Sequence, residues 1–411
     1  MTIMINLFIS ITYLLLSLLT GAYGEIPPEP AIVDYSQTNG RIYLDAAIDK
    51  NQNIHLIWMS IKPLQYHQTI EKTSPLYYQK GEELGKVWSK PLPFLTNKEY
   101  PLDRQYPRVI AAGDHVEVFW SLDGLHYKLS SDGGTTWGPE KRALPEMTTS
   151  YSVVAQLDTL YIVFSTIDST FFSKSTDFGS TWAPLDTIAP SMSSLADWSP
   201  LAMTIKDGNL HIVGEPENQR ESNASYRPWI YYIRGRNFGK DWDKPRIIDL
   251  TKGRSRTHFI ARANDVKILS YDDKIFISYK EKGLSYIESS DGGDSWSNPK
   301  YLPAVPDVMR YDICSGAGDK ALVFWIDFRN MNPYLENNDI FFTTVGRTIG
   351  QTIRLTPELS YAEIYYDAIF CGSVGDNTVV IWGGKRDIGE NALDDSTRSS
   401  EIFVRLLTSR D

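Results

Sequence analysis

The chain has 411 residues, of which 42% are hydrophobic and 22% are charged, and this composition excludes a wholly disordered protein. Its 41 Lys and Arg residues against 51 Asp and Glu residues give a net charge of -10, without any basic block. That balance argues against a nucleic-acid partner or an anionic membrane surface. Aromatic residues make up 12% of the chain, beside 28 Gly and 22 Pro. This mixture favours short strands joined by tight turns, so we expect an all-β protein.

The first 24 residues carry no charged side chain and contain an apolar run from Leu7 to Leu19, followed by small residues at Ala22 and Gly24. This pattern predicts a signal peptide over residues 1–24, cleaved before Glu25, with an uncleaved anchor as the alternative. No later stretch is apolar and long enough to span a bilayer. We therefore expect residues 25–411 to form a single domain that is secreted, extracellular or periplasmic, with no integral membrane segment.

A β-rich run that ends near an aromatic residue recurs along the chain, and each copy follows a Gly, Asp or Asn turn. Such regular spacing is typical of a repeat architecture. The seven copies are Ile54–Trp58, Val116–Trp120, Leu160–Phe164, Leu210–Gly214, Ile275–Tyr279, Leu322–Trp325 and Val379–Trp382.

An eight-residue pattern follows three of these runs, at Ser130–Trp137, Ser175–Trp182 and Ser289–Trp296. Two weaker copies, Gly81–Trp88 and Gly235–Trp242, keep only the Gly and the Trp. The pattern suits a hairpin turn, because the Asp carboxylate can accept backbone N–H groups and the Gly can adopt positive φ. The Trp is expected to fold back over the apolar edge of its own unit.

Each unit therefore consists of three strands, the turn pattern and a fourth strand. Four antiparallel strands repeated radially make a β-propeller. We predict seven blades, or six if the weak first or fifth unit is miscounted. The seventh unit lacks a fourth strand, and Pro28–Tyr35 resembles the strands that follow the turns. We expect this N-terminal segment to close the ring, which removes two exposed sheet edges.

The turn pattern is identified as the Asp-box, or BNR, repeat, and the chain resembles the sialidase-like propeller superfamily over nearly all of residues 25–411. The resemblance implies that the boxes lie on the face opposite the active site and have a structural role. It also implies an exo-acting glycoside hydrolase of acidic sugars. Sialidases hold the substrate carboxylate with three arginines, attack with a tyrosine assisted by a glutamate, and protonate the leaving group through an aspartate.

The chemistry of that set is consistent, because a neutral phenol approaches an anomeric carbon that carries a carboxylate without the repulsion a second anion would meet. Arginine forks bind carboxylates with paired hydrogen bonds. By position, the resemblance assigns Tyr366 as nucleophile, Glu215 as its base, and Asp45, Asp103 or Asp367 as the acid. The expected substrate-binding residues are Arg104, Arg310, Arg329, Arg386 and Trp198.

Two departures weaken the assignment. The family's Arg-Ile-Pro signature is absent, and Tyr106–Val109 resembles it only with the order changed. A seventh blade is also one more than the usual sialidase has. Whether the protein is an enzyme is therefore open at this point, and each arginine could instead pair with a carboxylate such as Asp312, Asp327, Asp367 or Asp387.

Two other functions fit the same sequence. A propeller that only binds glycan or protein needs aromatic groups at its mouth, such as Trp198, Tyr365 and Tyr366. A polysaccharide lyase acting on uronates needs a Tyr/His pair, and His67 and His258 are candidates. The His and acidic residues show no metal-binding spacing, so we expect no metal and no cofactor.

The only cysteines, Cys314 and Cys371, each stand eleven residues before the aligned tryptophans Trp325 and Trp382. They should occupy the same point on the inner strands of neighbouring blades. A disulfide is possible there in an oxidising compartment, and two buried free thiols are the alternative.

Overall fold

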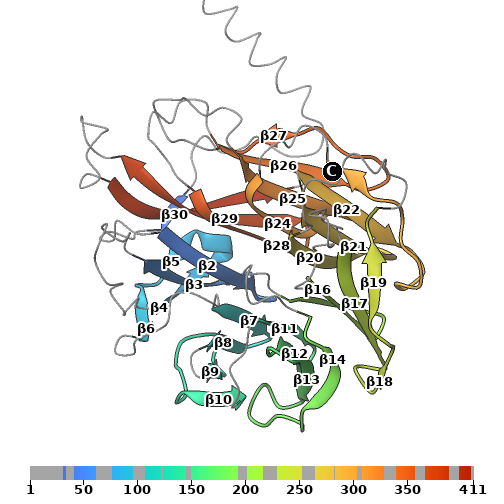
Figure 1. Cartoon of the computed structure of the whole chain (residues 1–411). Coiled ribbons are helices and arrows are strands. Elements are labelled where there is room, and N and C mark those ends of the chain that lie inside the picture. Colours follow the sequence, from blue (N-terminus) through green and yellow to red (C-terminus); the bar gives the residue numbers. More distant parts are fainter. Residues whose placement is uncertain are drawn as a thin grey trace, which may run out of the picture.

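The protein is an all-β propeller of seven antiparallel blades, as the sequence predicts. The computed structural model describes residues 31–33, 41–61, 76–95, 107–121, 124–144, 150–192, 201–215, 229–251, 264–281, 283–302, 308–327, 339–356, 366–387 and 398–408. Figure 1 shows the sheets arranged around a ring, with the first and last blades, blue and red, next to each other.

The first four blades follow one another in the sequence. Blade 1 contains β2 (Arg41–Ile48), β3 (Ile54–Ile61), β4 (Leu76–Glu82), β5 (Val87–Trp88) and β6 (Leu92–Leu95), with the 3-10 turn η1 (Glu83–Gly85) after β4. Blade 2 contains β7 (Arg108–Ala112), β8 (His115–Ser121), β9 (Leu125–Ser130) and β10 (Lys141–Leu144). Blade 3 contains β11 (Ser150–Gln156), β12 (Thr159–Ser165), β13 (Ser169–Ser175) and β14 (Asp186–Pro190). Blade 4 contains β15 (Ala202–Lys206), β16 (Asn209–Gly214), β17 (Trp229–Arg236), β18 (Asp241–Trp242) and β19 (Arg246–Asp249).

The last three blades complete the ring, and the seventh combines both ends of the chain. Blade 5 contains β20 (Asn264–Tyr271), β21 (Lys274–Lys280), β22 (Leu284–Ser289) and β23 (Lys300–Tyr301). Blade 6 contains β24 (Val308–Gly316), β25 (Lys320–Asp327), β26 (Asp339–Val345) and β27 (Ile353–Arg354). Blade 7 contains β28 (Tyr366–Val374), β29 (Asn377–Asp387), β30 (Arg398–Thr408) and β1 (Ala31–Val33).

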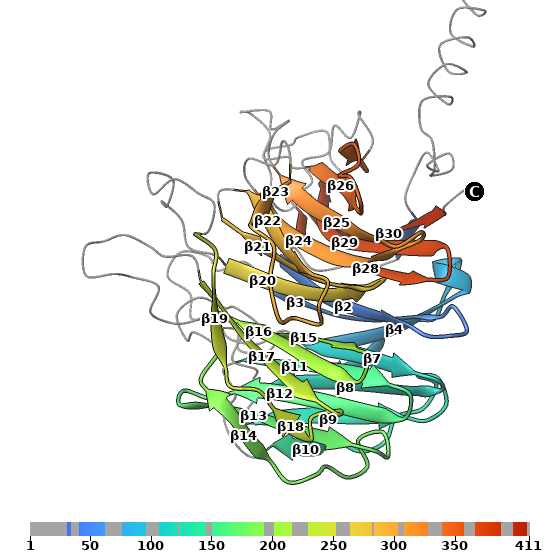
Figure 2. The same ribbon diagram turned by 90° about the vertical axis from the view of Figure 1, so that its right-hand side faces the viewer.

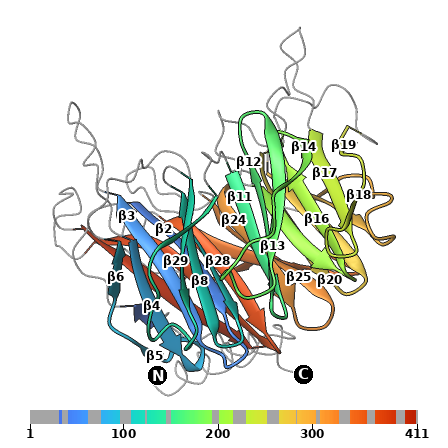
Figure 3. The same ribbon diagram turned by 90° about the horizontal axis from the view of Figure 1, so that it is seen from below.

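The N-terminal strand closes the ring, which confirms the expected role of the segment around Ala31. β1 pairs antiparallel with β30, with Ala31 opposite Val404 and Val33 opposite Ile402. The first strand of each blade, here called the inner strand, contacts the inner strands of both neighbouring blades, and β2 contacts β28 across the closure. Figure 2 shows β20, β24, β28 and β2 in succession, and Figure 3 shows β11 beside the sheet of β16 and β17.

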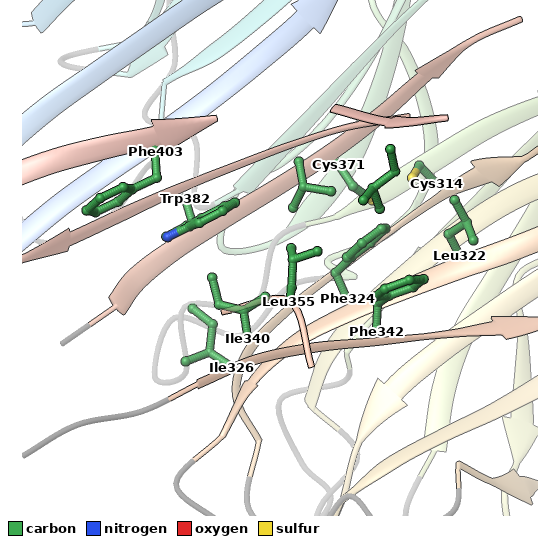
Figure 4. Packing of buried hydrophobic residues seen from close by; sticks show 12 residues of the cluster. Cys314, Leu322, Phe324, Ile326, Ile340, Phe342, Leu355, Cys371, Trp382 and Phe403 are labelled. Carbon is green, nitrogen blue, oxygen red and sulfur yellow. The ribbon is translucent and has the colours of Figure 1, made fainter. Parts of the chain in front are cut away.

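The hydrophobic core lies between blades. The second strand of each blade is buried on both faces because a neighbouring blade covers each of them, so most of its residues are apolar. One cluster joins Phe324 and Phe342 of blade 6 to Trp382 and Phe403 of blade 7 (Figure 4). The cysteines at the equivalent inner-strand position lie in the same cluster.

The three complete boxes form the same hydrogen-bonded turn. In the first, the Thr136 hydroxyl donates to Asp132 Oδ2 at 2.6 Å and the Thr136 N–H donates to Asp132 Oδ1 at 2.8 Å. These bonds stabilise the carboxylate and lower the pKa of Asp132 to about 2. Gly133 and Gly134 have positive φ, as expected. Asp177 and Asp291 make the matching bonds, and their pKa values are also lowered to about 2.

The box tryptophans connect neighbouring blades, whereas the sequence suggested that each covers only its own. The centroid of the Trp137 ring lies 4.8 Å from that of Tyr78 in blade 1, and the Trp296 ring lies 5.2 Å from Tyr232 in blade 4. Trp182 likewise meets Tyr127 of blade 2 edge-on. In the weaker first box, Gly81 replaces the Ser because a Cβ there would lie 2.8 Å from the Trp88 ring.

Candidate functional site

The inner strands are sheet edges that face the propeller axis, and side chains of neighbouring blades satisfy their backbone groups. The Val109 N–H of β7 donates to Asp45 Oδ2 of β2 at 3.0 Å. The Cys371 N–H of β28 donates to Asp312 Oδ2 of β24 at 2.9 Å. Asp45 and Asp312 stand thirteen residues before Trp58 and Trp325, the aromatic residues that end the second strands. The same position therefore supplies the same connection between two pairs of neighbouring blades.

Two cations complete a charged cluster on the inner strands. Arg108 Nη1 lies 3.4 Å from Asp45 Oδ1, and Lys267 Nζ lies 3.2 Å from Asp312 Oδ1. All four side chains are partly buried, with between 13% and 33% of each exposed. Burial raises the pKa of Asp45 against the lowering effect of Arg108. Burial acts to lower the pKa of Lys267, but Asp312 and Asp265 together outweigh it and raise that pKa.

A second charged cluster lies where the inner strands begin and the second strands end. This end of the ring, called the top end below, is opposite the box end because the strands of a blade alternate in direction. Glu215 follows β16, is fully buried, and accepts the Val266 N–H at Oε1 over 3.3 Å. Lys280 ends β21, and its Nζ donates to the Met309 carbonyl oxygen at 3.0 Å.

Tyr311 is buried beneath this cluster and is held by two hydrogen bonds. Its hydroxyl donates to the Asp265 carbonyl oxygen and accepts the Ser278 hydroxyl at 3.2 Å. Burial raises the pKa of the Tyr311 phenol, and the nearby carboxylates of Asp265 and Glu215 raise it further. Only 2% of Tyr311 is exposed, so it supports the site from below and does not reach a ligand.

Arg310 differs from the other cations of the top end. Burial lowers the pKa of Lys280, Asp265 raises it, and the positive charge of Arg310 lowers it again. The Arg310 side chain is exposed and makes no hydrogen bond or ion pair with any residue of the described ranges. Asp312, its nearest candidate partner in sequence, is paired with Lys267. Among the described residues, the top end therefore presents a guanidinium without a partner beside a half-buried ammonium group.

The other acids of blade 6 at this end have partners. The Trp325 Nε1–H donates to Asp327 Oδ2 at 2.8 Å. Asp339 accepts Arg354 Nη2 at 2.7 Å and the Thr356 hydroxyl at 2.8 Å. The first bond lies within β25, and Arg354 joins β26 to β27, so we assign Asp327 and Asp339 to the support of the blade.

The structure places some of the predicted site residues and leaves others outside the described ranges. Glu215 and Arg310 both lie close enough to Lys280 for their charges to affect its pKa. Asp45 lies in the first cluster, bound to Arg108 and Val109. Tyr366 and Asp367 lie at the start of β28, where Tyr366 is opposite Gly384, and Arg386 of β29 is opposite Ser399. The predicted residues outside the described ranges are Asp103, Arg104, Trp198, Arg329, Tyr365, His67 and His258.

Lys280, Asp265 and Lys267 were not identified from the sequence. Arg108 was noted only as part of Tyr106–Val109, which resembles the Arg-Ile-Pro signature with the order changed. A signal for two of them was present, since Arg108 and Lys267 each stand twelve residues before Trp120 and Tyr279. Lys280 directly follows Tyr279, just as Glu215 follows Gly214 at the end of the previous unit.

In the part of the chain that the structure describes, no group of three or more His, Cys, Asp and Glu residues could hold a metal ion. Within the same residues, no helix is long and apolar enough to cross a membrane.

Comparison with known proteins gives a result at the level of the fold. No family model and no curated protein matches the sequence. A protein of unknown function from Dyadobacter fermentans has a similar structure, with a TM-score of 0.52 and 11% identity, over 95% of this chain and 100% of that one. The phage phi92 endosialidase aligns with a TM-score of 0.49 and 12% identity, over 93% of this chain and 70% of that one. The NanB sialidase from Streptococcus pneumoniae aligns with a TM-score of 0.48 and 11% identity, over 92% and 70%.

Proposed function

We propose that the protein is a glycan-active propeller that binds an acidic sugar at its top end and releases it by exo-acting hydrolysis. The observation that carries this proposal is the exposed guanidinium of Arg310, which has no partner among the described residues, beside Lys280 and with Glu215 buried behind them. The protein has a net charge of -10, so an arginine that pairs with no carboxylate of the described ranges calls for a specific reason. Binding of a carboxylate supplies that reason, because the guanidinium fork forms paired hydrogen bonds with it.

In the proposed site, Arg310 binds the sugar carboxylate, and Lys280 adds positive charge next to it. Arg104, Arg329 and Arg386 are the other members of the proposed clamp, and Trp198 packs against the sugar. Tyr366 is the proposed nucleophile, with Glu215 as the base that takes its proton and Asp367 or Asp45 as the acid. A tyrosine suits this role because its neutral phenol is not repelled by the substrate carboxylate.

We further propose that residues 1–24 direct the protein out of the cytoplasm, which would bring it to extracellular glycans. The uncharged N-terminal segment with its apolar run supports this part of the proposal. A test is to compare the N-terminal residue of the protein recovered outside the cytoplasm with Glu25. A protein that keeps residues 1–24 and stays with the membrane fraction would support the uncleaved anchor instead.

The activity is tested with a panel of acidic glycans, measuring free acidic sugar, new reducing ends and unsaturated uronate in parallel. We expect release of a terminal acidic sugar, and we expect Tyr366→Phe to abolish release while glycan binding persists. Tyr301→Phe is the matched control, because Tyr301 is 53% exposed on β23, the outermost strand of blade 5. Unsaturated uronate would support a lyase, binding without release would support a binding module, and neither binding nor release would overturn the proposal.

A further inference from the structure

The two cysteines of the chain meet between blades 6 and 7. Cys314 lies in β24 and Cys371 in β28, and both side chains lie in the apolar cluster that joins the two blades. Both are free and buried, with 6% and 4% exposed. Figure 4 shows the two sulfur atoms in the apolar cluster that joins these blades.

Three observations show that this approach is fixed by the fold. The Cys371 N–H donates to Asp312 Oδ2 at 2.9 Å, which holds β28 against β24 two residues away from Cys314. The Ser373 hydroxyl donates to Cys314 Sγ at 3.8 Å, from the same two strands. The cysteines also occupy equivalent repeat positions, eleven residues before Trp325 and Trp382. These contacts place Asp312 beside Cys371 and Cys314 beside Ser373, an offset of two residues, so the two thiols lie close together in the folded protein.

We propose that Cys314 and Cys371 are a modification site, at which a small-molecule disulfide oxidises them to a disulfide that joins blade 6 to blade 7. The thiolate of one cysteine attacks the oxidant, such as oxidised glutathione, and one thiol leaves. The second cysteine then attacks the mixed disulfide, and a second thiol leaves. Two protein thiols are thereby oxidised, one oxidant disulfide is reduced to two thiols, and the Cys314–Cys371 bond forms.

The position of this bond gives it a structural consequence. Blade 7 is the blade built from both ends of the chain, and in the described ranges β1 contributes three paired residues to it, Ala31–Val33. A bond between β24 and β28 would hold that blade to blade 6 independently of β1. Burial raises the pKa of the Cys371 thiol, which disfavours the reactive thiolate in the folded protein. Oxidation is therefore expected during folding, when blades 6 and 7 have come together but solvent and the oxidant still reach the two thiols.

The test is to unfold the full chain in urea and to refold it in a mixture of reduced and oxidised glutathione. The refolded monomer is isolated, denatured again, and its free thiols are alkylated with iodoacetamide. Because the chain has two cysteines, the intact mass reads the result directly. We expect no alkylated thiol and one linked peptide pair containing Cys314 and Cys371. The oxidised protein should melt about 5 °C above the reduced protein. Cys314→Ser should remove that difference between oxidising and reducing buffer.

Two alkylated thiols on the native monomer would overturn the proposal. Separate glutathione adducts on Cys314 and Cys371 would do the same, because they would show that the oxidant reaches both sulfurs but the bond does not form. The parent mass measurement needs no variant, so it decides the question even if Cys314→Ser fails to fold. The outcome is independent of any glycan activity of the top end.

Discussion

The two ends of the propeller differ in how far the repeat is kept. At the box end, Asp132, Asp177 and Asp291 make the same hydrogen bonds within eight residues of chain. At the top end, equivalent positions hold unlike residues: the residue after the second strand's final aromatic position is Met59, Ser121, Ser165, Glu215, Lys280, Ile326 or Gly383. The comparison indicates that repeated local turns build the ring, and that specific chemistry lies where the repeat is not kept.

The largest effect of a substitution on stability at a fixed pH is expected at the box end from Gly134→Ala. Gly134 has a φ of +81°, and a Cβ there would lie 1.8 Å from the Tyr78 hydroxyl oxygen. Backbone strain and the clash between blades 1 and 2 should together cost about 3 kcal/mol in the free energy of unfolding. Urea denaturation of the variant and the parent measures this loss.

Gly375→Ala is the matched control for that variant. Gly375 also has positive φ, at +57°, but nothing lies within 4 Å of its would-be Cβ. Only the backbone strain remains, at about 1 kcal/mol. Equal losses of stability for the two variants would show that the turn Ser130–Trp137 does not pack tightly against Tyr78.

The next effect is that of Trp296→Ala, with Trp137→Ala and Trp182→Ala as repeats of the same test. Each ring is only half-buried between two blades, so the loss should fall below that of a fully buried aromatic residue, at about 2–3 kcal/mol. Glycan binding per folded molecule should stay unchanged. A Trp296→Ala protein that kept its melting temperature but lost binding would contradict the structural role of the boxes.

The same comparison explains what could be predicted from the sequence. The side-chain hydrogen bonds of the turn from Ser130 to Trp137 lie within its own residues, so its pattern, together with the recurring apolar runs, was sufficient to predict blades and turns. The contact of Trp137 with Tyr78 depends on a second blade, and it was not foreseen.

The top end was harder to predict for the same reason. Glu215 and Arg310 were found through a family resemblance, yet Lys280, which lies near both, was not. Its neighbours come from blades 4, 5 and 6, and no local pattern links them. The contact of Asp45 with the next inner strand could have been inferred by aligning inner strands, because Asp45 and Asp312 share one repeat position and each accepts a backbone N–H of the next blade.

One buried group should make stability depend on pH. His55 and His211 bond to Tyr78 and Tyr232 through Nδ1, and Glu117 takes the equivalent position in blade 2. Both carboxyl oxygens of Glu117 lack a hydrogen-bond partner within the described ranges, and burial raises the pKa of Glu117 from 4.5 to about 8. The unfolded chain ionises first, so this group should lower stability by up to about 1.4 kcal/mol per pH unit as the pH rises from 4.5 to about 8.

Glu117→Gln should remove this part of the pH dependence. The difference in unfolding free energy between pH 5 and pH 8, measured by urea denaturation, should shrink relative to the parent. Glu83→Gln serves as the control, because its side chain is 71% exposed. Parallel pH profiles for Glu117→Gln and the parent would show that Glu117 is not buried in its neutral form.

The smallest effect is expected from Asp132→Asn, and it has the opposite pH dependence. Hydrogen bonds from Thr136 lower the pKa of Asp132 to about 2, so the stabilisation is present above pH 3.8 and is lost as the pH falls towards 2. The variant should be less stable than the parent at pH 7, and this difference should narrow between pH 4 and pH 2. Circular dichroism during acid titration measures it, and a constant difference would exclude the role of the carboxylate charge.

An acidic-sugar site at the top end is tested most directly by measuring the affinity of two variants for an acidic glycan. Arg310→Met removes one positive charge at the top end, and Arg236→Met removes one at the box end. Arg236 is a matched control because it is 52% exposed but paired with Asp243 at 3.1 Å. Isothermal titration calorimetry with the tightest-binding acidic glycan of the panel should show a Kd at least about 10-fold weaker for Arg310→Met, as expected for loss of a charged hydrogen bond, and unchanged for Arg236→Met. An unchanged Kd for Arg310→Met, or an equal loss for both variants, would contradict an acidic-sugar site at the top end.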